Sequence, residues 1–196
     1  MPALARRPRL LILNASLNGD TGNTAAFLAE ARTHLAPVAD LTTLTLAHAN
    51  TPDFTTLLPA LSSADGFLIG TGTHWDSWSS VLQQFLEAAT PAEGTSLWLG
   101  KPAAVVVSEH SVGGKGVLSR LQGVLVTLGC IVPPMSGLVL SRAALIAVDH
   151  DAHAARDFWC REDLAVVCHN LVEASAGTQR WQTWPVDREN FTARWA

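Results

Sequence analysis

The first of three polar loops that could do chemistry has the composition of an anion-binding loop. It runs from Asn14 to Thr24 and is rich in glycine, asparagine and hydroxyl side chains. A phosphate is bound by converging backbone N–H groups, hydroxyl donors and the positive end of a helix, all of which this loop can supply. The loop has neither GxxxxGK[ST] nor GxGxxG, so a phosphate monoester fits it better than a triphosphate or pyrophosphate. The alternative is a plain polar loop in which Asn23 caps the helix that follows.

The second loop carries aromatic side chains beside titratable ones. It covers residues 71–78 and holds Trp75 and Trp78 next to His74 and Asp76. Two indole rings at the end of a buried strand suit a flat aromatic ligand. In the alternative interpretation, the two tryptophans cover the edge of the core while His74 and Asp76 are solvated.

The third loop, residues 108–116, is rich in glycine, which lets backbone approach a ligand closely. We expect its Lys115 to be a solvated charge. No GxSxG motif accompanies Ser108 and His110, so a serine triad is not indicated. The remaining candidates favour structural roles: we expect capping and solvation for His150, Asp151 and His153, and burial as small hydrophobes for Cys130, Cys160 and Cys168. We therefore predict no metal site.

The elements that position these loops are predicted from apolar runs that do not alternate with polar residues. Such runs are typical of strands buried on both faces and separated by helices. We expect strands at 9–14, 38–46, 66–70, 103–107 and 137–140. We expect helices at 24–35, around 57–61, from Ser80 with a Ser80–Gln83 capping box, from Gly116 to Leu128, and at 152–175. The pattern predicts an α/β three-layer sandwich with a parallel sheet, and places ligands at the carboxyl ends of its strands.

Composition limits the other possibilities. The 196 residues are 48% hydrophobic and 15% charged, with a net charge of −4. We expect one domain over 1–176 and an appendage over 177–196, whose Trp181, Trp184 and Trp195 would pack across the domain or a partner subunit. The chain has no basic stripe for nucleic acid, no apolar run long enough to cross a membrane and no signal-peptide core. We therefore expect a cytoplasmic protein without nucleic-acid or membrane partners.

The three loops also follow a recognisable order. Ala15-Ser16-Leu17-Asn18 and Gly22-Asn23-Thr24 stand where one family typically has Gly-Ser-x-Arg and Gly-Asn-Thr. Gly72–Asp76 and Leu82-Gln83 stand where that family has Pro-x-Tyr-Trp/Asn-Gly and Leu-Lys; Gly100-Lys101-Pro102 and Gly113-Gly114 match as well. Over about residues 10–140 the chain resembles the flavodoxin-like NAD(P)H-dependent FMN reductases, which include quinone and azo reductases.

This resemblance implies a five-stranded parallel sheet in the order 2-1-3-4-5, FMN as cofactor, and NADPH or NADH as hydride donor to a small acceptor such as a quinone or free flavin. It implies homodimers or homotetramers. The FMN phosphate would contact Ser16, Asn18, Asn23 and Thr24. The isoalloxazine would lie between two groups: Thr73, His74, Trp75 and Asp76, and His110, Val112 and Gly113. His110 is the candidate catalytic residue, polarising the pyrimidine end of the ring or an acceptor oxygen.

The sequence departs from the family pattern at positions that contact phosphate and NADP. Asn18 replaces the arginine, Gly72 and His74 replace the proline and tyrosine, and Gln83 replaces the lysine. These changes keep two alternatives open. One is a flavodoxin-type electron carrier, although such carriers are strongly acidic and this chain is only mildly so. The other is an interaction module with this fold that has lost FMN.

Overall fold

A computed structural model describes residues 6–47, 52–150 and 159–177. Its centre is a five-stranded sheet in which all neighbours are parallel and the order is β2-β1-β3-β4-β5. The strands are β1 (Arg9–Ala15), β2 (Asp40–Thr45), β3 (Gly66–Gly72), β4 (Ala103–Glu109) and β5 (Gly137–Ser141). This strand order confirms the predicted flavodoxin-like fold. The central strands form where the sequence has continuous apolar runs, such as Leu10–Leu13, which are buried on both faces.

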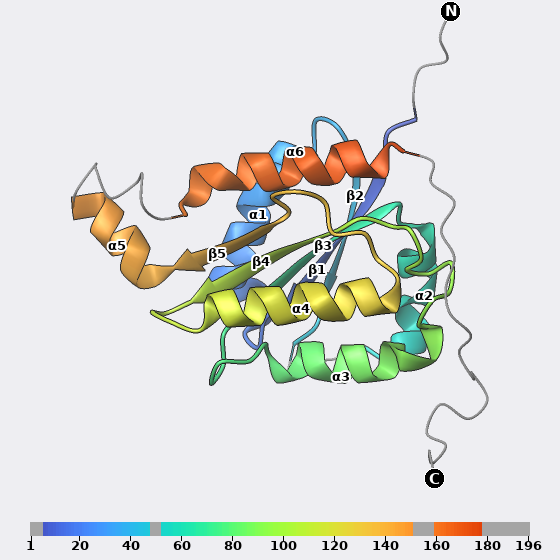
Figure 1. The fold of residues 1–196 in the computed structure, drawn as a ribbon, viewed down its shortest axis with the longest axis horizontal. Coiled ribbons are helices and arrows are strands. Elements are labelled where there is room, and N and C mark those ends of the chain that lie inside the picture. The colour runs from blue at the N-terminus through green and yellow to red at the C-terminus, as the bar shows by residue number, and fades with distance from the viewer. Residues whose placement is uncertain (1–5, 48–51, 151–158, 178–196) are drawn as a thin grey trace, which may run out of the picture.

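Helices cover both faces of the sheet and complete the three layers (Figure 1). The helices α1 (Asn23–Leu35) and α6 (Leu164–Ser175) pack on one face, where Phe27, Leu28 and Leu171 meet alternate strand residues. On the other face lie α2 (Phe54–Ser63), α3 (Ser80–Ala89) and α4 (Gly114–Leu128), around the buried Trp98. No helix among the described residues is long and apolar enough to cross a membrane.

The last helix, predicted over 152–175, is wrong over residues 159–163, and residues 152–158 lie outside the described residues. A separate helix, α5 (Arg142–His150), follows β5 directly, and α6 begins only at Leu164 after a short 3-10 turn, Arg161–Asp163. The Asp163 carboxylate accepts from the backbone N–H of Cys160 at 2.9 Å, which fixes that turn ahead of α6. His150 therefore lies at the end of a helix rather than at the start of one; Asp151 and His153 lie outside the described residues.

The predicted Ser80–Gln83 capping box of α3 is wrong: the helix has an N-cap one residue earlier, and Leu82 cannot complete a box. The cap is Ser79, whose Oγ accepts from the backbone N–H of Leu82 at 3.2 Å. Gln83 instead accepts from the indole N–H of Trp78 at 2.8 Å. The Ser79 hydroxyl also donates to the Ala15 carbonyl at 2.6 Å, so the start of α3 is tied to the end of β1. The three tryptophans of the predicted appendage lie outside the described residues.

Candidate functional site

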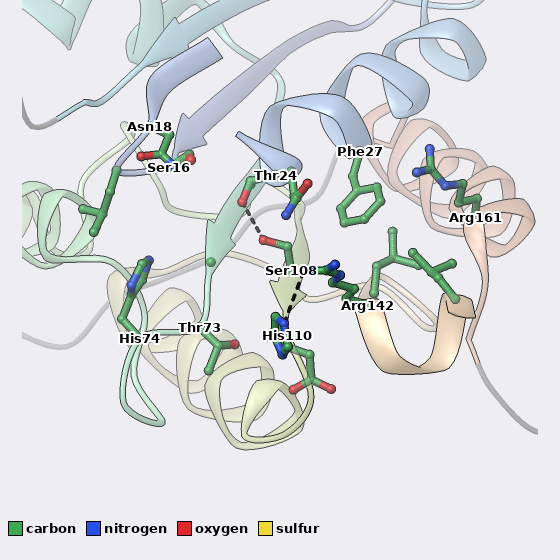
Figure 2. A pocket seen from close by; sticks show the side chains of 16 residues that line it. Ser16, Asn18, Thr24, Phe27, Thr73, His74, Ser108, His110, Arg142 and Arg161 are labelled. Atoms are coloured by element: carbon green, nitrogen blue, oxygen red, sulfur yellow. Dashed lines mark hydrogen bonds between the residues drawn. The ribbon is translucent and has the colours of Figure 1, made fainter. Parts of the chain in front are cut away.

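A cavity of about 420 Å³ opens at the carboxyl ends of β1, β3, β4 and β5, where a parallel sheet of this order is expected to bind its ligand (Figure 2). The three loops and the start of α1 contribute one part of its wall: Ser16, Leu17, Asn18, Asn23, Thr24, Gly72, Thr73, His74, Ser108, Glu109 and His110. Residues from α1, β5, α5 and the turn before α6 contribute the rest: Phe27, Leu140, Arg142, Leu145 and Arg161.

The first loop is held in shape by the buried side chain of Asn14. Its amide donates to the Gly19 carbonyl at 3.0 Å, while its Oδ1 accepts from the Ser16 backbone N–H at 3.3 Å. Ser16 is itself 6% exposed. A Cβ added at Gly22 would lie 2.7 Å from Ser16 Oγ, so the loop folds back closely on its own hydroxyl. The short polar segment is thus a fixed part of the pocket wall.

The N-terminus of α1 is left available on this wall. Its N-cap is Gly22, and no side chain among the described residues caps it. The alternative in which Asn23 caps the helix is therefore wrong: Asn23 is the first helical residue and lines the pocket. The first N–H groups of a helix carry the positive end of its dipole and need acceptors. This end of the pocket consequently favours an anion.

Thr24 connects the first loop to the third. The residue is 2% exposed, and its hydroxyl lies 2.7 Å from the Ser108 hydroxyl at the end of β4 (Figure 2). The pair brings together a helix start and a strand end from distant parts of the sequence. Each hydroxyl has one donor hydrogen and two acceptor lone pairs. One bond between the two hydroxyls therefore leaves a donor and further acceptors for a ligand in the cavity.

The second loop turns more sharply than its composition indicates. His74 and Ser77 exchange backbone hydrogen bonds at 2.7 and 3.0 Å, and the two residues between them have positive φ, 49° at Trp75 and 57° at Asp76. The tight turn directs the Trp75 side chain fully into solvent. Trp75 therefore does not line the cavity in this structure, and the alternative in which it covers the edge of the core is wrong. Trp78 packs against the core as the alternative predicted.

Thr73 lines the cavity and has a buried hydroxyl without a partner. No hydrogen-bond partner is found for its Oγ1 among the described residues. Buried polar groups are nearly always satisfied, so this hydroxyl is a candidate hydrogen-bonding group for a ligand of the cavity.

Some residues of the third loop line the cavity, and others are exposed at the surface. Glu109 Oε2 accepts from the Gly114 backbone N–H at 2.5 Å, which fixes the start of α4. Gly113 has φ +95°, and a Cβ there would collide with the Asp76 carboxylate. Val112 is 75% exposed. Of the predicted site residues, Trp75, Asp76, Val112 and Gly113 therefore do not line the cavity, although Gly113 and Asp76 pack together beside it.

The candidate catalytic residue His110 lies on the wall and faces an arginine. His110 Nε2 is 3.4 Å from Arg142 Nη1 (Figure 2). The other pocket arginine, Arg161, forms an ion pair with Glu30 at 3.0 Å and lies over the Phe27 ring. Sequence reasoning missed both arginines, as well as Phe27, Leu140 and Leu145. Arg142 could have been found, because it directly follows β5, and the carboxyl end of every strand in such a sheet is a candidate position.

Four side chains outside the cavity can be compared with expectation. Lys115 is exposed, as predicted for a solvated charge, and its ammonium also lies 4.4 Å from the centre of the Trp159 ring. Cys130 and Cys168 are buried as expected, and burial raises the pKa of each thiol to about 12. Cys160 is only partly buried.

Comparison with known proteins identifies the family. The model of the NADPH-dependent FMN reductase family matches residues 8–144. A comparison with curated protein sequences finds no match.

Similar solved structures confirm the fold. RosB with the bound intermediate 8-demethyl-8-formylriboflavin-5′-phosphate shares 14% identity, with 86% of this chain and 79% of that chain covered and a TM-score of 0.67. The apo form of the NADH:FMN oxidoreductase EmoB shares 14%, over 83% and 89%, with a TM-score of 0.59. An archaeal flavodoxin shares 13%, over 86% and 99%, with a TM-score of 0.61. Since the family match spans all five strands and all three loops, the chain belongs to the NADPH-dependent FMN reductase family and is a flavin-dependent oxidoreductase.

Proposed function

We propose that this chain binds FMN in the cavity at the strand ends and passes hydride from NADPH or NADH through the flavin to a small acceptor, such as a quinone or free flavin. The observation that carries the proposal is the neutral donor loop, defined as the uncharged cavity-lining residues Ser16, Asn18, Asn23 and Thr24, at the uncapped N-terminus of α1. The same cavity is lined by Thr73, whose hydroxyl is unsatisfied. Family membership supports the same cofactor.

The phosphate would occupy the end of the cavity formed by Ser16, Asn18, Asn23 and Thr24. These side chains are uncharged, and the family's arginine is absent at Asn18. The positive end of the α1 dipole and its free N–H groups would therefore take a larger share of the stabilisation than in relatives with the arginine. The tight approach of Gly22 to Ser16 keeps these donors converging on one position.

The isoalloxazine would lie along the part of the wall formed by Thr73, His74 and His110. Thr73 Oγ1 would donate to a ring oxygen or nitrogen and so gain the partner that it lacks. Asp76 and Gly113 would act indirectly, by packing together and holding the second and third loops against each other. When bound, FMN supplies the hydride-transfer chemistry itself. His110 would place a polar ring nitrogen beside the pyrimidine end, where reduction adds negative charge.

The test begins with the absorption spectrum of the protein purified with and without added FMN, followed by titration calorimetry. We expect FMN to bind, and we expect replacement of both Ser16 and Thr24 by alanine to abolish that binding. Under anaerobic conditions, NADPH or NADH should then bleach the bound flavin. Binding without bleaching would instead favour the flavodoxin-type carrier. A colourless protein that gives no heat with FMN would contradict both and favour an interaction module.

A further inference from the structure

A charged side chain, Arg142, lies at the end of the cavity formed by β5 and α5. Arg142 is the first residue of α5 and lines the cavity beside Leu140 and Leu145. Figure 2 shows its guanidinium directed from α5 into the cavity, toward His110. The cavity therefore has two polar regions of different character, a neutral donor loop and a cationic end.

The charge of Arg142 is not compensated within the described part of the chain. The ion pairs found there join Arg6 and Arg9 to Asp65, Arg7 to Asp40 and Arg161 to Glu30, and none includes Arg142. Glu109 lines the same cavity, but its Oε2 accepts from the Gly114 backbone N–H, and its carboxylate forms no ion pair with Arg142. The contact with His110 is a hydrogen bond only when Nε2 is the unprotonated acceptor, since a guanidinium can only donate. His110 therefore supplies no countercharge.

The position of Arg142 is also electrostatically unfavourable for the fold. A cation in the first turn of a helix faces the positive end of the helix dipole, and α5 has no acidic residue in that turn to offset it. Neither the stability of α5 nor an ion pair with another described residue explains an arginine here. An anion bound in the cavity would account for the residue, because it would be attracted by both the guanidinium and the helix dipole.

The residues around Arg142 indicate the chemical character of the rest of the ligand. Phe27 and Leu140 line this end of the cavity from almost completely buried positions, and the partly buried Leu145 packs beside them. A ligand that contacts these side chains and Arg142 together must be largely apolar and carry an acidic group. Free quinones without a charged substituent would leave the guanidinium unused.

We propose that Arg142 is a specificity-determining residue that binds the carboxylate, sulfonate or phosphate of a flat aromatic acceptor. The proposal rests on the proposed function, since it assigns the charge of the molecule that the flavin reduces. The FMN phosphate is the competing source of the anion. The neutral donor loop and the open α1 terminus already provide for that phosphate, which favours the acceptor as the partner of Arg142.

The test uses the FMN-loaded protein and two redox-inactive probes of the same shape, 2-naphthoate and 2-naphthamide, in titration calorimetry. We expect the wild-type protein to bind the carboxylate about tenfold more tightly than the amide, as for one charge-assisted hydrogen bond at a partly exposed site. Arg142→Gln should remove this preference, and Arg142→Lys should retain part of it. Arg32→Gln changes an exposed arginine on α1 that bonds Thr43, and should leave the preference unchanged.

Two further measurements separate the possible outcomes. The melting temperature of Arg142→Gln should not fall, because the substitution removes a cation from a helix N-terminus; a large fall would indicate a structural role and overturn the proposal.

The affinity of the apoprotein for FMN relative to riboflavin should be the same in the wild type and Arg142→Gln. If that ratio drops while the naphthoate preference persists, Arg142 serves the cofactor and the proposal is wrong. Equal affinity of the wild type for both probes, or no binding of either, also overturns it, whereas failure of FMN to bind the wild type would contradict the proposed function itself.

Discussion

The hydroxyl oxygens of Thr24 and Ser108 lie 2.7 Å apart, although 84 residues separate them along the chain. The first belongs to the opening turn of α1 and the second to the end of β4, so this hydrogen bond joins the first loop to the third inside the cavity. The two loops that would hold opposite parts of one ligand are thereby fixed to each other before the ligand arrives.

This bond predicts a measurable coupling. Thr24→Val and Ser108→Ala should each destabilise the apoprotein by about 1 kcal/mol, the usual net contribution of a partly buried hydrogen bond. The double variant should cost about the same as either single variant, which gives a coupling energy of about 1 kcal/mol in urea unfolding. Effects that simply add would show that the contact contributes nothing to stability. Thr24→Val should also weaken FMN binding more than Ser108→Ala, because Thr24 lies at the helix terminus.

The central strands could be predicted from sequence because each is a short, uninterrupted apolar run. The runs at 66–70 and 103–107 correspond to β3 and β4, which continue by two residues into polar positions that no hydrophobic pattern marks. Those polar extensions include Ser108 and Glu109, which line the cavity. Hydrophobic periodicity therefore predicts the sheet and the carboxyl ends of its strands, where the site lies. It does not predict the polar residues that complete the cavity wall.

Other parts of the site depend on geometry that composition does not encode. The direction of the Trp75 side chain follows from a two-residue turn with positive φ at both residues, a conformation usually associated with glycine or asparagine. Phe27 and Arg161 reach the cavity only because α1 and the turn before α6 lie side by side, as the Arg161–Glu30 ion pair shows. Such long-range packing leaves no local signal in a single sequence.

The two glycines at the start of α4 predict opposite responses to the same substitution. Gly113→Ala should lower stability by more than about 1 kcal/mol, because an L residue is strained at φ +95° and its Cβ would collide with the Asp76 carboxylate. Gly116→Ala should raise stability by about 0.5–1 kcal/mol, since it lies within the helix with nothing near its added Cβ. Thermal unfolding of the two variants provides the comparison. Equal destabilisation would mean that the glycine-rich segment tolerates no side chain anywhere, contrary to this structure.

A pH-dependent contribution to stability comes from the amino end of β3, at the end of the sheet opposite the cavity. Partial burial acts to raise the pKa of Asp65, but hydrogen bonds from the Arg9 side chain and backbone and from Arg6 outweigh it and lower that pKa below 3.8. A carboxyl whose pKa is depressed on folding stabilises the native state above its unfolded pKa of about 3.9, and this contribution is lost as the pH falls through the folded value.

Asp65→Asn should therefore destabilise the protein by about 0.5–1 kcal/mol at pH 7, a magnitude reduced for partly exposed ion pairs. The difference between variant and wild type should shrink as the pH is lowered below about 4. Denaturant unfolding at pH 7 and pH 3 measures both values, and Asp40→Asn is a control, because Asp40 is more exposed and its contact with Arg7 is longer, at 3.6 Å. A gap for Asp65→Asn that widens in acid would contradict the assigned direction of the pKa shift.

The unsatisfied hydroxyl of Thr73 predicts that stability and binding change in opposite directions. Thr73→Val replaces a buried oxygen that has no partner among the described residues with a methyl group of the same shape. The apoprotein should become more stable by about 1 kcal/mol, since an unpaired buried polar group costs about 1–3 kcal/mol. FMN affinity should fall about tenfold, because the ligand group that bonds Thr73 would then be left without its donor. Calorimetric titration and thermal unfolding of the same preparation measure the two effects. If the variant is less stable and binds FMN as tightly as the wild type, the hydroxyl has a structural partner in the folded protein and plays no part in holding the flavin.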